Sequence, residues 1–501
     1  MFKHSSCCRW AKRDEDYLLL KTHMQRGHYE GHDAYPVMPF YSLALEFSME
    51  ELLFVSKHWA KRFNDDVDQG GFRVHLTWNS AFMNFAEEGR LRIAFISADI
   101  YRLHPVGKST NAIYRFFDLD RYEVYVYGLI PEQLYEIHRN GGFSGREIFH
   151  DLSGMSDSEG ALTINDHGIH VLVELSGHTL GVRMGFLSNQ PAPVCMHYLG
   201  YGGTIGSSFV HYFLGDHVIA PPELNPYYTE KFIYLPPPFY VTSYRHDLHK
   251  FPRITPRSHD NFTQDRAKYG LPPTSPVLCM FNQLHKTSRR MWNTIGQMMA
   301  KAPNATLWTL GDDDDCRRGI RGRIVDWGGR ADQIVVAHQA PIWDHLLRHN
   351  LADVYLDNPA YNGGTTGTDS YWAGCPTLTL ALEKFSARYG VSQNRGMGLD
   401  LFSARTWDDF RDLGAALANS PKTLRKVRKY IEDTRATQPL FDTRRWVRRF
   451  QRAMSMTFET VLFTGERYHI VLTPDAPSDK RPHDTEDPVP MEPDDDMLGE
   501  G

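Results

Sequence analysis

Short apolar runs of strand length alternate with segments of helical periodicity along most of the chain, and this alternation restricts the fold more than any other feature. The first apolar run, residues 91–97, is followed by a helical pattern at about 111–117 and a second apolar run at 122–129. A strand, a helix and a second strand at this spacing predict two parallel strands joined by a crossover. A second set of such units follows a polar region at about 247–270. We therefore expect an α/β protein with two parallel, doubly wound sheets.

The length of 501 residues is enough for two cores with additional segments. We expect a mostly helical segment at 1–90, a first α/β half at 91–250, a second half at 251–445, a terminal helix at 446–470 and a tail at 471–501. The tail is rich in proline and acidic residues, and we expect it to be disordered because it has little apolar surface to bury.

Composition excludes several classes of protein. The net charge is −6 and many acidic residues gather in the tail, so the folded body lacks the strong basic excess of a nucleic-acid-binding protein. No apolar run reaches the roughly 18 residues of a membrane span, and the polar N-terminus lacks the apolar core of a signal peptide. The six cysteines form no CxxC pair, so we expect no zinc site and a reducing compartment, the cytoplasm or the nucleus.

The stretch 351–377 has the pattern of a phosphate-binding turn. An apolar strand ends at Asp357, a glycine- and threonine-rich turn covers 363–367, and a helix is expected over about 368–373. Glycines allow close approach of the backbone, and a helix N-terminus favours an anion. The candidate ligands of a nucleotide diphosphate are Gly363, Gly364, Thr365 and Thr366, with Asp369 placed to accept from a ribose hydroxyl. The alternative is an ordinary strand-to-helix connection.

Polar residues follow several of the predicted strands, at 99–104, 176–179, 283–286, 338–341 and 358–366. The carboxyl ends of parallel strands meet at one edge of a sheet, where such folds bind their ligands. Two halves with polar loops at these edges predict a ligand in the cleft between them.

These segments are similar to the motifs of a known family. The chain from about Cys7 to Phe458 resembles the catalytic region of the O-GlcNAc transferase family, glycosyltransferase family 41. The resemblance depends on SADIYRLHPVGKS at 97–109, DHGIHVLVELSGHT at 166–179, FNQLHK at 281–286 and NGGTTGTDSYWAGCP at 362–376. It implies a glycosyltransferase B fold, with two Rossmann-like domains facing across a cleft. It also implies inverting transfer of GlcNAc from UDP-GlcNAc to Ser/Thr hydroxyls of intracellular proteins.

The resemblance also implies roles for single residues. Gln283 and Lys286 match donor-binding positions, and Lys286 would offset the charge of the leaving UDP. His345 and Arg348 match an H-x-x-R that lies at the uracil. The phosphate-binding threonines match Thr365 and Thr366, and the ribose-binding aspartate matches Asp369.

The proton acceptor of the reaction stays open between two residues. His104 matches the active-site histidine of the family, and Asp99 matches an aspartate near it. An acidic run at 312–315 contains an Asp-x-Asp that could hold a metal, but a helix-capping role is favoured. Because Lys286 and a helix N-terminus can replace a cation, we expect no metal and no cofactor beyond the donor substrate.

The chain departs from the family at several positions. Lys108 stands where the family has a second histidine, Ile342 replaces a lysine, Gly364 replaces a histidine, and Tyr361 replaces a small cysteine near the N-acetyl group. No tetratricopeptide repeat is visible. The sequence is therefore expected to be a fragment, an incomplete gene model, or a member that binds acceptors in another way. A partner that carries repeats is one such way.

Two other functions remain open. A Spindly-type protein O-fucosyltransferase using GDP-fucose is favoured by VELSGHT at 173–179 and by Tyr361, whereas His345, Arg348 and TTGTD at 365–369 favour UDP-GlcNAc. A non-catalytic module that binds nucleotide sugars is the third hypothesis, motivated by the changed site residues and the missing repeats.

Two basic segments, 422–430 and 443–452, carry apolar residues at helical spacing. This pattern indicates packed helices with a solvated basic face. Binding of phosphoinositides or nucleic acid is the alternative.

Overall fold

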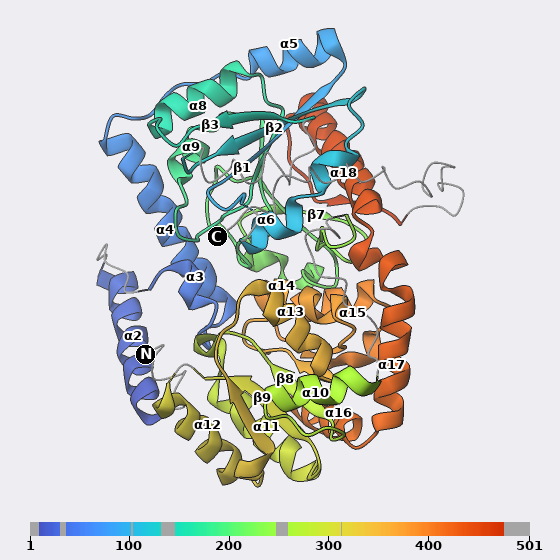
Figure 1. Ribbon diagram of the computed structural model, residues 1–501. Helices are drawn as coiled ribbons and strands as arrows, with labels where there is room; N and C mark the ends of the chain where they lie inside the picture. Colours follow the sequence, from blue (N-terminus) through green and yellow to red (C-terminus); the bar gives the residue numbers. More distant parts are fainter. Residues whose placement is uncertain are drawn as a thin grey trace.

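The computed structural model describes residues 10–30, 37–101, 104–131, 146–246, 259–311 and 313–474. These residues form two halves, each built on one parallel sheet with helices on its faces (Figure 1). The predicted disordered tail lies outside the described residues from position 475 onward. No helix among the described residues is long and apolar enough to cross a membrane.

The first half contains an eight-stranded sheet in the order β14-β7-β6-β5-β4-β1-β2-β3. All of its neighbouring strands are parallel. Its strands are β1 Leu91–Ser97, β2 Tyr122–Gly128, β3 Ile148–Asp151, β4 Val171–Glu174, β5 Val194–His197, β6 Tyr212–Gly215, β7 Lys231–Tyr234 and β14 Ile470–Val471.

The second half contains a six-stranded sheet in the order β10-β9-β8-β11-β12-β13, again parallel throughout. Its strands are β8 Val277–Met280, β9 Thr306–Leu310, β10 Ile334–Ala337, β11 Val354–Leu356, β12 Thr377–Leu380 and β13 Ser403–Ala404. Two parallel sheets with helices are the predicted α/β architecture.

The helices of the N-terminal segment and the first half are α2 Trp10–Glu30, α3 Pro39–Ser42, α4 Met49–Gln69, α5 Asn79–Glu88, α6 Pro105–Thr110, α8 Asp157–Asp166 and α9 Met184–Ser188. Those of the rest are α10 His259–Lys268, α11 Arg289–Lys301, α12 Asp314–Asp326, α13 Ile342–Leu351, α14 Thr365–Trp372, α15 Tyr389–Gly396, α16 Trp407–Ala418, α17 Pro421–Thr434 and α18 Thr443–Thr464. Short 3₁₀ turns connect them: η1 Ile113–Phe116, η2 Pro222–Tyr227, η3 Leu284–Lys286, η4 Ala331–Gln333, η5 Phe385–Ala387, η6 Asp400–Phe402, η7 Arg435–Thr437 and η8 Pro439–Phe441.

Two helices begin earlier than the sequence predicts. The segment predicted as a helix at 111–117 is a short 3₁₀ turn, and the α-helix before it, α6, begins at Pro105. Proline is favoured in the first helical turn, and the His104 side chain caps this turn by accepting from the Val106 N–H. Helix α14 begins at Thr365 rather than near 368. Helix α5 and strand β3 were not predicted.

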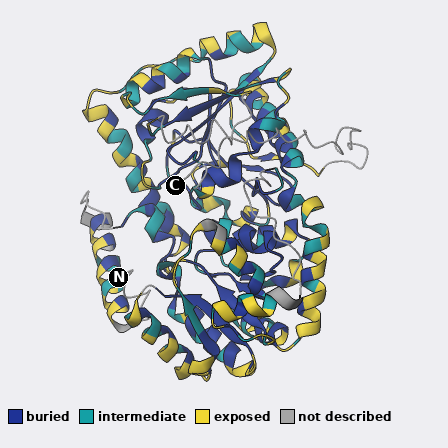
Figure 2. Ribbon diagram, viewed as in Figure 1, coloured by how far each residue is buried: buried dark blue, intermediate teal, exposed yellow. Residues whose placement is uncertain are grey.

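The strands are buried because helices cover both faces of each sheet (Figure 2). In β1, Ile93, Ala94 and Phe95 are fully buried, which explains the continuous apolar run in the sequence. The last long helix, α18, packs on this first sheet, with Phe450 stacked on Phe95 at 5.8 Å between ring centroids.

The basic segments form packed helices, as predicted. On α17, Leu424 and Ile431 are buried while Lys422, Arg425 and Lys426 are exposed. The acidic run also has the predicted capping role, because Asp313 accepts from the Cys316 N–H at 2.8 Å and begins α12. Asp312 lies outside the described residues.

Candidate functional site

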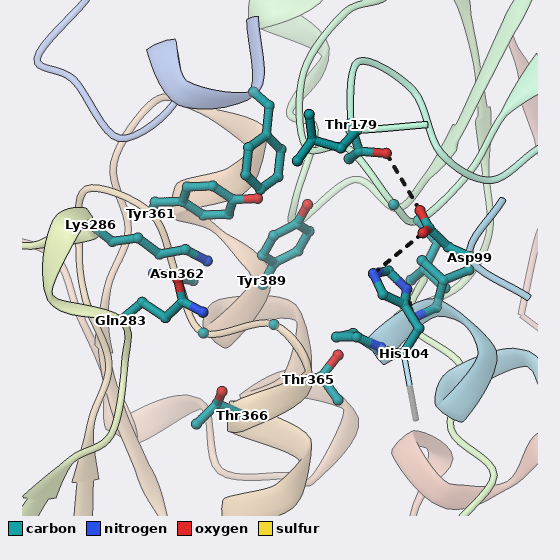
Figure 3. Close-up of a pocket in the computed structure, with 18 of the residues that line it drawn as sticks. Asp99, His104, Thr179, Gln283, Lys286, Tyr361, Asn362, Thr365, Thr366 and Tyr389 are labelled. Atoms are coloured by element: carbon teal, nitrogen blue, oxygen red, sulfur yellow. Dashed lines mark hydrogen bonds and ion pairs between the residues drawn. The ribbon is translucent and has the colours of Figure 1, made fainter. Parts of the chain in front are cut away.

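A cavity of about 910 Å³ opens between the two halves (Figure 3). It receives side chains from loops at the carboxyl ends of strands in both sheets, as expected for parallel α/β folds. The first half contributes Asp99, Tyr101, His104, Thr179, Leu180 and Tyr240, and the second half contributes Asn282, Gln283, Lys286, Tyr361, Thr365 and Tyr389, among others.

Most of the predicted site residues line this cavity. Asp99 and His104 approach it from one side, and Gln283 and Lys286 from the other (Figure 3). The turn at Gly363, Gly364, Thr365 and Thr366 also lines it. The other three predicted residues, His345, Arg348 and Asp369, are not among its lining residues.

A buried carboxylate holds the glycine-rich turn in place. Asp357 follows β11 and accepts from the N–H groups of Gly363 at 2.7 Å and Asn358 at 2.9 Å. Burial raises the pKa of Asp357 to about 6, while these N–H donors oppose the rise. A side chain on Gly363 would collide with the Tyr355 hydroxyl, 2.3 Å from the position of an added Cβ. The glycine is therefore required by close packing.

The turn ends at an uncapped helix. Gly364 has a φ of +56° and is the residue directly before α14. No side chain caps the N-terminus of this helix. The Thr365 hydroxyl lies 2.7 Å from that of Tyr240, which belongs to the first half. The N–H groups of Thr366 and Gly367 bond to the Gly363 and Gly364 carbonyl oxygens, at 3.2 Å and 3.0 Å. The positive dipole end of the helix is thus the feature of this turn that favours a phosphate.

Lys286 supplies a positive charge on the same side of the cavity. Its Nζ lies 3.7 Å from the centre of the Tyr361 ring, a cation–π contact. Burial lowers the pKa of Lys286 to about 8, and the charge of Asp357 opposes the decrease. No described carboxylate lies within 4.0 Å of this ammonium group. It is thus mainly protonated at neutral pH and available to an anionic ligand.

Asp99 and His104 form a pair on the opposite side. Nε2 of His104 lies 3.6 Å from Asp99 Oδ1, and its Nδ1 accepts from the Val106 N–H at 3.3 Å. Burial, with the charge of Glu174, raises the pKa of Asp99 to about 6. Burial lowers the pKa of His104 to about 4. At neutral pH the pair is therefore a carboxylate beside a neutral imidazole.

Asp369 is engaged by residues of the first half. The Lys108 ammonium and the Tyr244 hydroxyl both bond to its Oδ1, and His345 Nε2 lies 3.9 Å from Oδ2. Although burial disfavours its charge, Lys108 and His345 lower the pKa of Asp369. The carboxylate predicted to receive a ribose hydroxyl is thus occupied by Lys108 in this structure.

Arg348 lies beyond this cluster, where it donates to the His338 carbonyl at 2.7 Å and its guanidinium lies 5.2 Å from the centre of the Tyr269 ring.

Several lining residues were not predicted. Tyr240 and Tyr389 line the cavity from opposite halves, with ring centroids 6.2 Å apart. Phe40, from the N-terminal segment, contacts Tyr361 edge-on at 6.0 Å. Isolated aromatic residues in loops carry no distinguishing pattern, so a single sequence offers little signal for them.

Comparisons with known proteins agree with this architecture. The model of "Glycosyl transferase family 41" matches residues 73–263 and 257–450. A probable UDP-N-acetylglucosamine–peptide N-acetylglucosaminyltransferase SEC of Arabidopsis thaliana is 31% identical over 452 residues, covering 89% of this chain and 45% of the relative. A protein named as a probable transferase of the same kind, SPINDLY, also from Arabidopsis thaliana, is 26% identical, covering 75% of this chain and 42% of the relative.

The fold is also found in a solved structure. A mutant O-GlcNAc transferase of Thermobaculum terrenum superposes with a TM-score of 0.72 at 22% identity, covering 85% of this chain and 77% of that one. The chain spans less than half the length of these two Arabidopsis relatives.

Proposed function

Because the chain belongs to glycosyl transferase family 41, we propose that it is an inverting glycosyltransferase that moves GlcNAc from UDP-GlcNAc to Ser/Thr hydroxyls of intracellular proteins. The observation that carries this proposal is the cavity itself. A phosphate-binding turn and a buried lysine face a carboxylate–imidazole pair across one space. This arrangement supports a donor on one side of the cavity and an acceptor on the other.

On the donor side, the diphosphate would lie between Lys286 and the N-terminus of α14. The negative charge that develops on leaving UDP would be stabilised by the ammonium group and by the helix dipole. Thr365 and Thr366 add hydroxyl donors. These charges are fixed before the reaction begins, so the transfer needs no metal ion.

On the acceptor side, we assign proton acceptance to Asp99. His104 Nδ1 accepts from Val106, so the proton of the neutral ring is on Nε2, which faces Asp99. The imidazole therefore orients Asp99 rather than accepting the proton. A carboxylate with a pKa near 6 is more basic than an exposed one and still ionised at neutral pH.

The position of Tyr361 favours a different sugar nucleotide as the alternative donor substrate. Its ring occupies the cavity between Lys286 and Phe40, where it reduces the space for a large sugar substituent. GDP-fucose, which lacks an N-acetyl group, is the alternative donor, and SPINDLY proteins are among the relatives. The proposed acceptors are protein or peptide hydroxyls in either case. Delivery of the acceptors by a partner that carries repeats, and a cytoplasmic or nuclear location, remain predictions.

The test is nucleotide release by the purified chain with a Ser/Thr peptide, with UDP-GlcNAc and GDP-fucose assayed in parallel. We expect UDP release together with a peptide mass gain of one HexNAc, both lost in Lys286→Ala. Release of GDP with a deoxyhexose mass gain would assign the chain to the fucose branch. Tight UDP binding without transfer to any peptide would contradict an enzyme and favour a binding module.

A further inference from the structure

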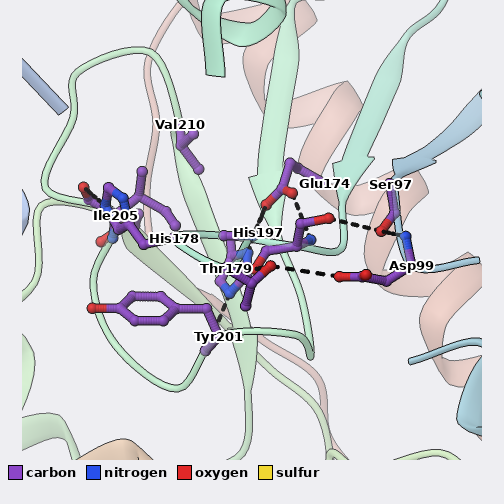
Figure 4. Close-up of polar contacts among 12 residues, drawn as sticks. Ser97, Asp99, Glu174, His178, Thr179, His197, Tyr201, Ile205 and Val210 are labelled. Carbon is purple, nitrogen blue, oxygen red and sulfur yellow. Dashed lines mark hydrogen bonds and ion pairs between the residues drawn. The ribbon is translucent and has the colours of Figure 1, made fainter. Parts of the chain in front are cut away.

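A buried histidine and a buried glutamate lie beneath the acceptor side of the cavity (Figure 4). Glu174 is the last residue of β4, His197 is the last residue of β5, and the two are partners in the strand register. Nδ1 of His197 lies 3.0 Å from Glu174 Oε2, and its Nε2 lies 2.8 Å from the carbonyl oxygen of Tyr201. Their side chains are 0% and 4% exposed for His197 and Glu174 respectively.

The contacts of this pair hold both side chains in one position. Both ring nitrogens of His197 face oxygen atoms, Glu174 Oε2 and the Tyr201 carbonyl oxygen. The Glu174 carboxyl group also receives the N–H groups of Ser176 at 2.5 Å and Gly177 at 2.7 Å. The pair is therefore buried with its hydrogen bonds satisfied.

The same pair fixes the loop at 176–181, which contributes Thr179, Leu180 and Gly181 to the cavity. Gly177 adopts a φ of +57°, and an added Cβ would lie 2.9 Å from His197 Cε1. The loop thus packs directly on the imidazole, with its backbone N–H groups held by the glutamate. Its conformation depends on both side chains.

Two hydrogen-bonded routes lead from this loop to Asp99 (Figure 4). The Thr179 hydroxyl lies 2.9 Å from the Ser176 carbonyl oxygen and 3.5 Å from Asp99 Oδ2. The Ser176 hydroxyl lies 2.7 Å from that of Ser97, which accepts from the Asp99 N–H at 2.9 Å. Both the carboxylate and the backbone of Asp99 are therefore connected to the loop that Glu174 holds.

We propose that the buried Glu174–His197 pair is a positioning element for the transfer reaction, which fixes the loop at 176–181 and so aims the Asp99 carboxylate at the acceptor hydroxyl. The inference rests on the proposed function, because Asp99 accepts a proton only if a hydroxyl is the acceptor. Neither Glu174 nor His197 lines the cavity, so both act through Asp99.

The pair also affects the charge of Asp99. The titratable groups that face Asp99 are His104 from the cap of α6, Tyr101 from the same loop, and Glu174 from β4. Burial is the larger cause of the raised pKa of Asp99, and the negative charge of Glu174 adds to it. Removing that charge should lower the pKa of Asp99. Because Asp99 must be ionised to accept a proton, the acid limb of activity should then move to lower pH.

The decisive variant is Glu174→Gln, which keeps the size of the side chain and removes its charge. We expect kcat at pH 7.5 to fall by about tenfold or more, with the donor KM changed by less than about twofold, because only positioning of the acceptor base is lost. The acid limb of kcat/KM should move to lower pH. The titration of Asp99, followed by NMR on ¹³C-labelled aspartate and assigned with Asp99→Asn, should move in the same direction.

A matched control is Glu230→Gln. Glu230 is also buried, 2% exposed, and accepts from the Thr204 hydroxyl at 2.7 Å and the Ile205 N–H at 2.6 Å. It holds the neighbouring loop, in which the Ile205 carbonyl oxygen lies 2.8 Å from His178 Nε2, and among the described residues it forms no hydrogen bond to Asp99. This variant should lose stability to a similar extent while keeping the acid limb of the parent, so that a shift of that limb in Glu174→Gln can be assigned to the removed Glu174 charge.

One result would overturn the proposal: a folded Glu174→Gln protein whose Asp99 titration and kcat equal those of the parent. If the parent itself transfers no sugar, the proposed function fails, and the NMR titration alone then decides whether the pair controls Asp99.

Discussion

Lys286 is the side chain that supplies positive charge on the donor side of the cavity. Replacing Lys286 with alanine should lower kcat by about 10²–10³-fold, the usual effect of removing one preorganised electrostatic contact to a developing negative charge. Steady-state kinetics with a Ser/Thr peptide would measure it. Lys286→Arg should retain part of the activity because it keeps the charge. Equal rates for the alanine variant and the parent would exclude a role of Lys286 in leaving-group stabilisation.

The pKa of Lys286 gives a pH prediction. Since burial lowers this pKa to about 8, the free enzyme loses the ammonium charge as the pH rises through that value. The kcat/KM for the donor should therefore fall above about pH 8. A bound diphosphate favours the charged amine, so kcat should fall only at higher pH. If kcat/KM and kcat fell at the same alkaline pH, this assignment of Lys286 would be contradicted.

Gly364 offers a test of the phosphate seat. Its φ of +56° disfavours any other residue, so Gly364→Ala should destabilise the protein by about 1 kcal/mol. Thermal unfolding would measure the loss. Since the added Cβ would meet no atom closer than 3.7 Å, the protein should still fold. Binding of UDP should weaken, because the turn must shift away from the phosphates to relieve the strain.

For single residues, the sequence predicts a place in the site when the segments that position the residue are contiguous in the chain. Thr365 and Thr366 lie in the cavity because the strand, turn and helix that place them are contiguous in the chain. The contact of Asp369 with Lys108 was not predicted, because these residues are 261 positions apart and meet only when the halves come together.

Single elements show where local rules are sufficient. The short apolar runs predict most strands correctly, because a strand that is buried on both faces of a parallel sheet needs continuous apolar residues. The start of α6 was placed too late, since the capping role of His104 and the proline after it were interpreted as a loop. Strand β3 was missed because it lies at the sheet edge, where its burial is only partial.

The N-terminus of α12 allows a test between two roles of its acidic run, a metal site and a helix cap. Asp313 accepts from the Cys316 N–H, and the Asp314 and Asp315 carboxylates pair with Arg317 and Arg318. Asp313→Ala should lower the free energy of unfolding by about 1 kcal/mol through loss of the cap. Transfer rates of parent and variant should be the same with and without a chelator. A rate that falls with chelator and is restored by Mg²⁺ or Mn²⁺ would contradict metal independence.

For the whole molecule, the Lys108–Asp369 contact joins the two halves beside the nucleotide turn. Lys108→Met should destabilise the protein by about 3 kcal/mol, because it leaves the buried Asp369 carboxylate without its lysine, with only the Tyr244 hydroxyl and His345 beside it. UDP should nevertheless bind about tenfold more tightly to the folded variant, since Asp369 becomes available to a ribose hydroxyl. Calorimetry at a temperature well below unfolding would measure this. Weaker binding in Lys108→Met would instead show that Lys108 itself contacts the nucleotide.

The course of the chain through the two halves was only partly predicted. The terminal helix was expected, but its return to the first sheet was not, because short apolar segments do not reveal which sheet they join. Helix α18 covers that sheet, and β14 adds a strand at its edge beside β7.

The return of α18 and β14 limits how the cleft could open. The backbone passes from the first half to the second after β7, and passes back again before α18. Two covalent connections at separate points form a hinge. Such a hinge permits rotation about the line through the two points and resists twisting or sliding of one half against the other. A donor would then enter by a swing of one half about that fixed axis. Cutting either connection should release the other motions while leaving each sheet intact.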